Sequence, residues 1–272
     1  TDFLLVAIPM FVLLGEILLR AGITEKMYDG IVKWLGWLPG GLMHSNVGSS
    51  ALFAATSGSS VATAATIGTV AIPQIQRRGY NERLFLGTIA AGGTLGILIP
   101  PSIILMILYG LLTDTSVPEL YLAGFIPGFL LAALFMLPVI ILCIMRPNWG
   151  GDPINASWRE RFSSLPALVP PIGIFIVVVG SIYAGIATPT EAASLGVIAA
   201  MGLAAANGTL TIGMLRSAIE GTMRTTSMIM LIILAAVFLN FVLSVIGLTQ
   251  ALADFVTGLG LSPFQTMLML VA

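Results

Sequence analysis

The stretch Ala55-Thr56-Ser57-Gly58-Ser59-Ser60 decides how this chain folds. It interrupts an otherwise apolar segment, Gly41–Ile75, which is hydrophobic enough to enter a membrane. Glycine and clustered hydroxyl residues favour turns and helix caps, so we expect a helix to break here. Two topologies fit such a break. The segment either crosses the membrane once, or enters and returns as a hairpin of two half-helices.

The composition requires lipid as the surrounding solvent. Of the 272 residues, 57% are hydrophobic and 8% are charged, whereas a water-soluble domain carries about 25% charged residues. We therefore predict an all-α, multi-pass membrane protein. The net charge of -1 gives no indication of a nucleic-acid partner. The expected spans are Phe3–Leu19, Leu84–Leu112, Tyr121–Met145, Leu165–Ile186, Ala192–Ala206 and Met228–Leu248. Ile23–Leu38 and Leu210–Met223 mix charged and apolar residues and are predicted as amphipathic interfacial helices.

The positive charges discriminate between the two topologies. All eleven fall into five clusters: Arg20/Lys26/Lys33, Arg77/Arg78/Arg83, Arg146/Arg159/Arg161, Arg216 and Arg224. Three connections have no Lys or Arg, namely Thr113–Leu120, Ala187–Glu191 and Thr249–Ser262. A hairpin that opens toward the cytoplasm places every basic cluster on one side and every basic-free connection on the other, as the positive-inside rule requires. A single crossing breaks this pattern. Charge sorting does not separate a hairpin from two short full spans.

The hairpin tip has the chemistry of a binding site. Backbone that is irregular at membrane depth needs protein or a water-filled cavity to satisfy its polar groups. The half-helix that ends at the tip offers carbonyl oxygens to a cation, and the half-helix that starts there offers N–H groups to a carboxylate. The hydroxyls of Ser57, Ser59 and Ser60 add further oxygens. The alternative is a kinked helix pair whose small residues only permit close packing.

Span Leu84–Leu112 contains a second interruption. It reads Gly92-Gly93-Thr94-Leu95-Gly96 and then Pro100-Pro101-Ser102. Two adjacent prolines remove two hydrogen-bond donors, so we expect a broken helix. Broken helices near the bilayer midplane commonly mark ion or substrate sites in secondary transporters. A proline kink beside a glycine packing face is the structural alternative.

Two further features have structural explanations. Thr188-Pro189-Thr190-Glu191 has the pattern of a capping box that opens a helix, although Thr188 and Thr190 can also line a cavity. Glu16 and Arg20 have the spacing of an i,i+4 ion pair. The sequence contains one histidine and one cysteine, and it lacks GxxxxGK[ST], HExxH and GxSxG motifs. We predict neither an enzyme nor a cofactor.

Three motifs, taken in order, resemble the large membrane subunit of TRAP transporters (DctM-like permeases). They are Ser57-Gly58-Ser59-Ser60-Val61-Ala62-Thr63-Ala64-Ala65-Thr66-Ile67-Gly68, Gly92-Gly93-Thr94-Leu95-Gly96-Ile97-Leu98-Ile99-Pro100-Pro101-Ser102 and Ala187-Thr188-Pro189-Thr190-Glu191-Ala192-Ala193. The resemblance covers the whole chain. It implies a sodium-driven, elevator-type carrier built from inverted repeats in the bacterial inner (cytoplasmic) membrane.

The resemblance also implies partners and residue roles. The partners would be a periplasmic substrate-binding protein and a small membrane subunit, and the substrates would carry carboxylates, as C4-dicarboxylates and sugar acids do. Ser57–Ser60 would form the tip of the first hairpin. Gly92–Thr94 and Pro100–Ser102 would form the unwound region that helps to hold sodium as the coupling ion. The sodium ligands would come from Ser57, Gly93 and Thr94.

The expected organisation has two parts. Residues 1–186 would form the first repeat, with the hairpin at about 41–76 and the broken helix at about 84–112. Residues 187–272 would start the second, inverted repeat. The chain starts without Met and ends in an apolar run before a second hairpin or a second paired-proline break, so we expect an internal segment of a longer protein. A carrier that works without a binding protein and an uncoupled channel component are the alternative functions.

Overall fold

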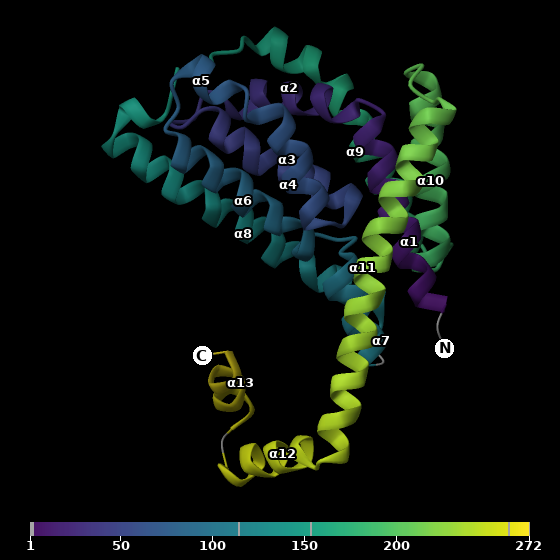
Figure 1. The fold of residues 1–272 in the computed structure, drawn as a ribbon. Helices are drawn as coiled ribbons and strands as arrows, with labels where there is room; N and C mark the ends of the chain where they lie inside the picture. The colour runs from purple at the N-terminus through teal and green to yellow at the C-terminus, as the bar shows by residue number, and fades with distance from the viewer. Residues whose placement is uncertain (1–2, 114, 153, 261, 272) are drawn as a thin grey trace. The chain divides into compact units, whose positions relative to one another are not determined.

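The computed structural model describes residues 3–113, 115–152, 154–260 and 262–271, and the regular elements in these ranges are all helices (Figure 1). The predicted all-α class is confirmed. The helices of the first 150 residues are α1 (Phe3–Arg20), α2 (Ile23–Leu35), α3 (Leu42–Ser57), α4 (Ser60–Ala71), α5 (Gln74–Arg78), α6 (Glu82–Leu98), a π-helical turn (Ile103–Ile107), α7 (Leu108–Thr113), α8 (Val117–Met145) and a 3-10 turn (Pro147–Trp149). The remaining helices are α9 (Trp158–Tyr183), α10 (Pro189–Ala206), α11 (Ile212–Val245), α12 (Leu248–Gly258) and α13 (Pro263–Val271).

The chain forms two compact units, Thr1–Met223 and Arg224–Ala272. The first contains α1 to α10 and the first turns of α11, and the second contains the rest of α11 with α12 and α13. Within the first unit α10 packs along α1 and α9. The predicted repeat boundary between 186 and 187 concerns an internal symmetry rather than compactness, and it stays a prediction.

Helices α3 and α4 form the predicted hairpin. Only Gly58 and Ser59 separate them, the two helices pack against each other, and both pack against α6 (Figure 1). The backbone amide of Leu42, where α3 begins, donates a 3.0 Å hydrogen bond to the hydroxyl of Tyr80, which follows α5. Burial raises the pKa of the Tyr80 hydroxyl. The chain therefore leaves the hairpin where it entered, which excludes the single crossing.

The lengths of the two arms favour a re-entrant hairpin over two short spans. α3 has 16 residues and α4 has 12, so at 1.5 Å per residue they are about 24 and 18 Å long. A hydrocarbon core of about 30 Å requires about 20 residues of helix. Neither arm is long enough to reach the opposite surface.

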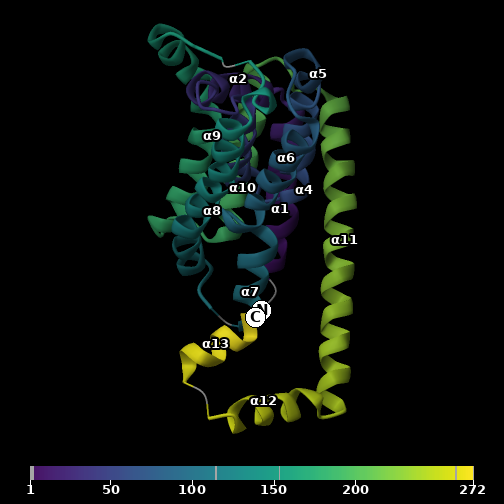
Figure 2. The same ribbon diagram turned by 90° about the vertical axis from the view of Figure 1, so that its left-hand side faces the viewer.

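The basic clusters of the first unit gather at one end. Lys26 Nζ donates to Asn207 Oδ1 at 3.2 Å, which joins α2 to the connection between α10 and α11. Asn81 N donates to Trp149 O at 3.2 Å, and Ile154 N donates to Gly36 O at 3.1 Å. Accordingly, α2 and α5 lie at the same end in both views, away from α7 (Figure 2). The grouping of the basic residues at one end agrees with the charge pattern, and the orientation of the hairpin in the membrane stays a prediction.

The basic-free connections meet at the opposite end of the first unit. Tyr183 Oη donates to the carbonyl of Pro118 at 3.4 Å, which joins the start of α8 to the connection before α10. Asp114, which the sequence analysis placed in one of these connections, lies outside the described residues. The separation of basic and basic-free ends within this unit is the arrangement that a membrane imposes.

Among the described residues, four helices are long and apolar enough to cross a membrane: α8, α9, α10 and α11. A fifth span arises if α1 and α2, bent by 74° to each other, count as one. The predicted separate amphipathic helix at Leu210–Met223 is wrong, because these residues start the continuous 34-residue helix α11. No proline interrupts α11, and the Arg216–Glu220 ion pair at i,i+4 bridges its early turns.

The hairpin topology predicts which positions share a membrane face. In the full-length protein with Cys143→Ser, cysteines at Lys33 and Arg78 should react with a membrane-impermeant maleimide from the same side. A cysteine at Glu119 should react only from the other side. Labelling of Lys33→Cys and Arg78→Cys from opposite sides would exclude the hairpin.

Candidate functional site

The hairpin tip is a tight turn between two helix ends. Gly58 adopts a left-handed conformation with φ 60° and ψ 14°, and its amide donates to Ala54 O at 2.9 Å. Ser59 is extended and caps α4, where its hydroxyl accepts a 3.3 Å hydrogen bond from the amide of Ala62. A glycine at the first position and an N-cap serine at the second are what this reversal requires.

A chain of hydroxyl contacts ties the two arms together beneath the tip. Ser57 Oγ lies 3.3 Å from Thr63 Oγ1, and Thr63 donates to the carbonyl of Ser59 at 2.7 Å. Ser57 and Thr63 are fully buried, whereas Ser59 and Ser60 are half-buried. The tip therefore presents a buried side, formed by Ser57, and a more open side, formed by Ser59 and Ser60.

Glycines on α6 bring the backbone of the tip into close contact. An ideal Cβ on Gly96 would lie 2.7 Å from the amide nitrogen of Ser60 and 2.8 Å from the carbonyl oxygen of Ser59. One on Gly93 would lie 2.7 Å from Ala64 Cβ, and one on Gly92 would lie 2.6 Å from the hydroxyl of Ser50. Any side chain at these positions would push the hairpin away from α6.

Helix α1 closes the other side of the tip. An ideal Cβ on Gly15 would lie 3.1 Å from Ser57 Cβ and 3.5 Å from the Ser57 carbonyl oxygen. The predicted tip residues are thus held between α1 and α6. The glycine motif is therefore a packing face for the hairpin, and its interpretation as part of an ion or substrate site stays a prediction.

The first arm has a polar interior that the sequence analysis missed. Asn46 accepts a 2.7 Å hydrogen bond from Tyr28 on α2 and donates a 3.0 Å hydrogen bond to Thr88 on α6. Three more buried hydroxyls on α3 have no hydrogen-bond partner among the described residues: Ser45, Ser49 and Ser50. The signal that could have found them is the run His44-Ser45-Asn46 followed by Ser49-Ser50 inside an apolar segment.

The paired prolines break the helix as predicted. α6 ends at Leu98, residues 99–102 are not helical, and a π-helical turn resumes at Ile103. Ser102 is buried and donates its hydroxyl to the carbonyl of Ile97. α8 covers the break, since an ideal Cβ on Gly128 would lie 2.8 Å from Ile99 Cγ1. Pro100 and Pro101 are themselves buried.

The expectation that Gly92–Thr94 are unwound is wrong. These residues lie inside the continuous helix α6, and the break starts five residues later. Each helical glycine costs about 1 kcal/mol relative to alanine, but only proline removes the backbone donor.

The three predicted sodium ligands face different surroundings. Ser57 lies against α1 and Gly93 lies against the second arm. The Thr94 side chain is exposed, and its hydroxyl donates to the carbonyl of Ala91 at 2.7 Å. Their role as sodium ligands stays a prediction.

Thr188 is occupied by helix capping. Its hydroxyl accepts from the Glu191 amide at 3.4 Å, and the Glu191 carboxylate accepts from the Thr188 amide at 2.8 Å. Pro189 occupies the first turn, so the predicted capping box is confirmed. Thr190 is buried at the start of α10. A role for Thr188 and Thr190 in lining a cavity stays a prediction.

The family model for the DctM component of the tripartite ATP-independent periplasmic (TRAP) transporters matches residues 1–272. This chain belongs to the DctM family. The C4-dicarboxylate TRAP transporter large permease protein DctM of Pseudomonas aeruginosa is 35% identical over 267 residues, with 98% of this chain and 62% of the relative covered.

Two other relatives are named for different substrates. The sialic acid TRAP transporter large permease protein SiaM of Vibrio cholerae is 32% identical, with 99% of this chain and 62% of the relative covered. The ectoine TRAP transporter large permease protein TeaC of Halomonas elongata is 37% identical, with 72% of this chain and 45% of the relative covered. The chain thus spans at most 62% of the length of these relatives.

Membership of the DctM family establishes the class of this protein. The family consists of transporter permeases rather than enzymes. The apolar helices α8 to α11 agree with the inner-membrane location of this family. The hairpin tip, its glycine-faced support on α6 and the broken end of that helix form the candidate functional site of this chain.

Close contact between α6 and the tip should make Gly96 intolerant of substitution. Gly96→Ala forces a methyl group against backbone atoms, and overpacking of this kind typically costs about 1–3 kcal/mol. We expect a lower melting temperature for the purified full-length protein. Gly87→Ala is the matched control, because a Cβ at this α6 position meets nothing within 4 Å. Equal melting temperatures for the two variants would contradict the packing.

Proposed function

We propose that this chain is part of the permease subunit of a sodium-driven, binding-protein-dependent TRAP transporter that takes up small molecules bearing a carboxylate. The observation that carries the proposal is the tip at Ser57–Ser60, where one helix ends and another begins within two residues. The family assignment supports the transport class. The coupling ion, the substrate and the partners are the proposed elements.

The tip can serve a cation and an anion through opposite helix ends. The last carbonyl oxygens of α3 lack the amide donors that a further helical turn would supply. The negative end of the helix dipole is at the same position, so these oxygens suit a cation. On α4, Ser59 accounts for the amides of Ala62 and Thr63. The backbone amides of Ser60 and Val61, at the start of α4, can then donate to a carboxylate.

Carboxylate chemistry is common to the substrates for which the relatives are named. C4-dicarboxylates, sialic acid and ectoine differ in size and in their other groups, but each carries at least one carboxylate. A site built from backbone N–H groups and hydroxyls binds this shared group without selecting the remainder of the molecule. Selection among organic acids then falls to the periplasmic binding protein, which together with the small membrane subunit is the proposed partner.

Sodium-coupled transport should depend on the tip hydroxyls. In proteoliposomes containing the full-length transporter and its binding protein, an inward sodium gradient should drive uptake of the organic acid. Ser57→Leu/Ser59→Leu should abolish this uptake, because bulky apolar side chains replace oxygens at the tip. Ser163→Leu is the matched control, since Ser163 is an exposed serine on α9, and it should transport normally.

The uptake rate of each variant is divided by the amount of folded protein in the same proteoliposomes. Ser59→Thr retains the capping hydroxyl and should retain uptake if the double variant fails for chemical reasons. Wild-type uptake in the folded double variant would reject the tip as the site. Uptake that does not respond to the sodium gradient would reject sodium coupling.

Dependence on a binding protein separates the proposal from its alternatives. Omission of the binding protein from the same proteoliposomes should reduce sodium-driven uptake to background. Undiminished uptake would instead indicate a carrier that works alone. Conductance without counterflow of labelled substrate would indicate an uncoupled channel, because only a carrier exchanges substrate across the membrane.

A further inference from the structure

An ion pair on α1 lies outside the candidate site. Glu16 and Arg20 are one helical turn apart, and Arg20 Nη1 lies 2.9 Å from Glu16 Oε2. The predicted i,i+4 pair is therefore confirmed. The Glu16 side chain is only 16% exposed and that of Arg20 is 29% exposed. Charged groups in an apolar helix are expensive unless they are paired, and they often mark function.

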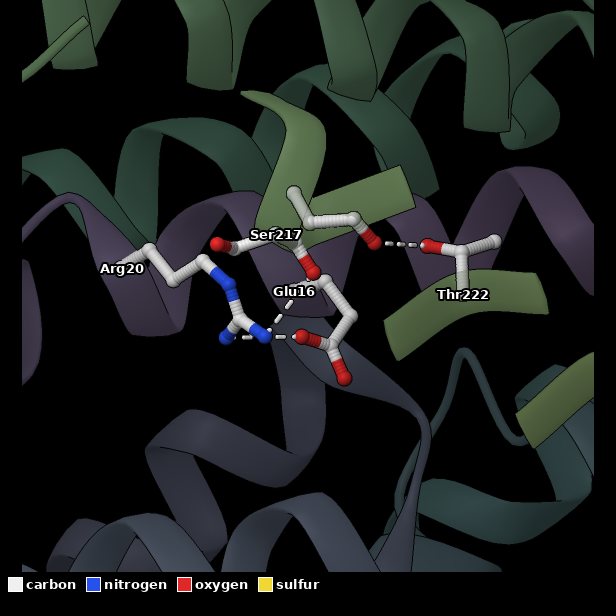
Figure 3. Close-up of polar contacts among 5 residues, drawn as sticks. Glu16, Arg20, Ser217 and Thr222 are labelled. Atoms are coloured by element: carbon white, nitrogen blue, oxygen red, sulfur yellow. Dashed lines mark hydrogen bonds and ion pairs between the residues drawn. The ribbon is translucent and has the colours of Figure 1, made fainter. Parts of the chain in front are cut away.

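The pair reaches across to the first turns of α11. Figure 3 shows Glu16 and Arg20 beside Ser217 and Thr222. Arg20 Nη2 donates a 3.0 Å hydrogen bond to the backbone carbonyl of Ser217. A carbonyl oxygen can accept this bond in addition to one within its own helix. Arg20 thus connects a carboxylate on its own helix to the backbone of another helix.

The surface of α11 that meets this pair consists of small residues. An ideal Cβ on Gly221 would lie 2.6 Å from Glu16 Oε2 and 2.7 Å from Oε1. Ala218 is fully buried, and Thr222 is 8% exposed, with its hydroxyl bonded to the carbonyl of Ala218 at 2.8 Å. Any side chain at 221 would meet the Glu16 carboxylate, which would then have to shift.

The same helix carries an ion pair that serves as a reference. Arg216 and Glu220 are also at i,i+4, with Arg216 Nε 2.8 Å from Glu220 Oε1. Their side chains are 80% and 62% exposed, and such exposed pairs contribute little to stability. The half-buried Glu16–Arg20 pair differs, because water only partly compensates the charge that remains when one partner is removed. The two pairs share spacing and chemistry but not burial.

The contact also lies next to the hairpin tip along the chain. Gly15 contacts Ser57, and the following residue, Glu16, contacts Gly221. Adjacent residues of α1 therefore touch the tip and α11. The position of α1 at this level depends on both contacts.

We propose that Glu16 and Arg20 are a positioning pair that docks the first turns of α11, Ile212–Met223, onto α1 beside the hairpin tip. Arg20 provides the hydrogen bond to α11, Glu16 holds Arg20 in place, and Gly221 admits the carboxylate. This role concerns the assembly of the permease and goes beyond the proposed function, because it requires neither sodium nor substrate.

Amide hydrogen exchange measures the docking directly. The full-length protein in lipid nanodiscs is compared with its variants by mass spectrometry of peptides from 212–223. Arg20→Met should speed exchange in these peptides about tenfold or more, because the inter-helix bond is lost and Glu16 is left unpaired. Arg20→Lys, which can still pair and donate, should stay near the wild-type rate.

The control variants separate docking from general instability. Arg216→Met should leave exchange unchanged, and Glu16→Gln/Arg20→Met should perturb it less than Arg20→Met alone, because no charge is then left unpaired. Peptides from α8 should exchange as in the wild type. Equal exchange at 212–223 in Arg20→Met and Arg216→Met would overturn the proposal, as would an effect spread evenly over the protein.

A second pair of variants tests the docking without removing a charge. Gly221→Leu should speed exchange at 212–223, because the side chain displaces α11 from the carboxylate. Gly213→Leu, which lies on the same helix with only Thr211 Oγ1 within 4 Å, should not. Equal exchange in these two variants would overturn the proposal even if Arg20→Met does not fold. Neither test uses transport, so its result is independent of the proposed function.

Discussion

The peptide groups that a broken helix exposes in an apolar environment must find partners, and the rest of the first unit depends on this constraint. At Gly58 and Ser59 one helix ends and the next begins. Ser59 caps the new helix, Thr63 bonds back to its carbonyl, and Gly93 and Gly96 let α6 approach the backbone itself. An unpaired N–H or C=O in such a place costs several kcal/mol. The backbone of the tip therefore depends on α4 and α6 for its partners. The N–H and C=O groups that remain unpaired lie together at the tip.

The glycines of α6 and the paired prolines have separate tasks that the sequence alone does not distinguish. Glycine removes a side chain, so a neighbouring backbone can come within contact distance, as the tip does at Gly96. Proline removes a donor, so the helix has to end, as it does before Pro100. A motif that contains both is easily assigned a single function. In the structure the first part supports the hairpin and the second part opens the helix.

The sequence predicts the features that depend on local chemistry or on charge. The hairpin follows from Gly58 and from the positions of Arg77 and Arg78, and the capping box follows from Thr188 and Glu191. Features that depend on distant partners are not predicted. Asn46 stands in a polar run of α3, but the sequence does not show that its partners are Tyr28 and Thr88. The continuity of α11 was missed because charged residues at its start suggested a separate surface helix, whereas the structure docks these turns on α1.

The docking of α11 illustrates why a membrane protein would use charged residues to hold two helices together. In a soluble protein, apolar residues such as leucine usually do this. Lipid chains are as apolar as the side chains, so burial of apolar surface does little to hold two membrane helices together. Small residues such as Ala218 and Gly221 bring the helices close, but they supply few specific contacts. The bond from Arg20 to the backbone of Ser217 adds direction, because a hydrogen bond requires a defined geometry between donor and acceptor. Glu16 pairs with the guanidinium that makes this bond, so in the proposed docking the two residues act as one unit.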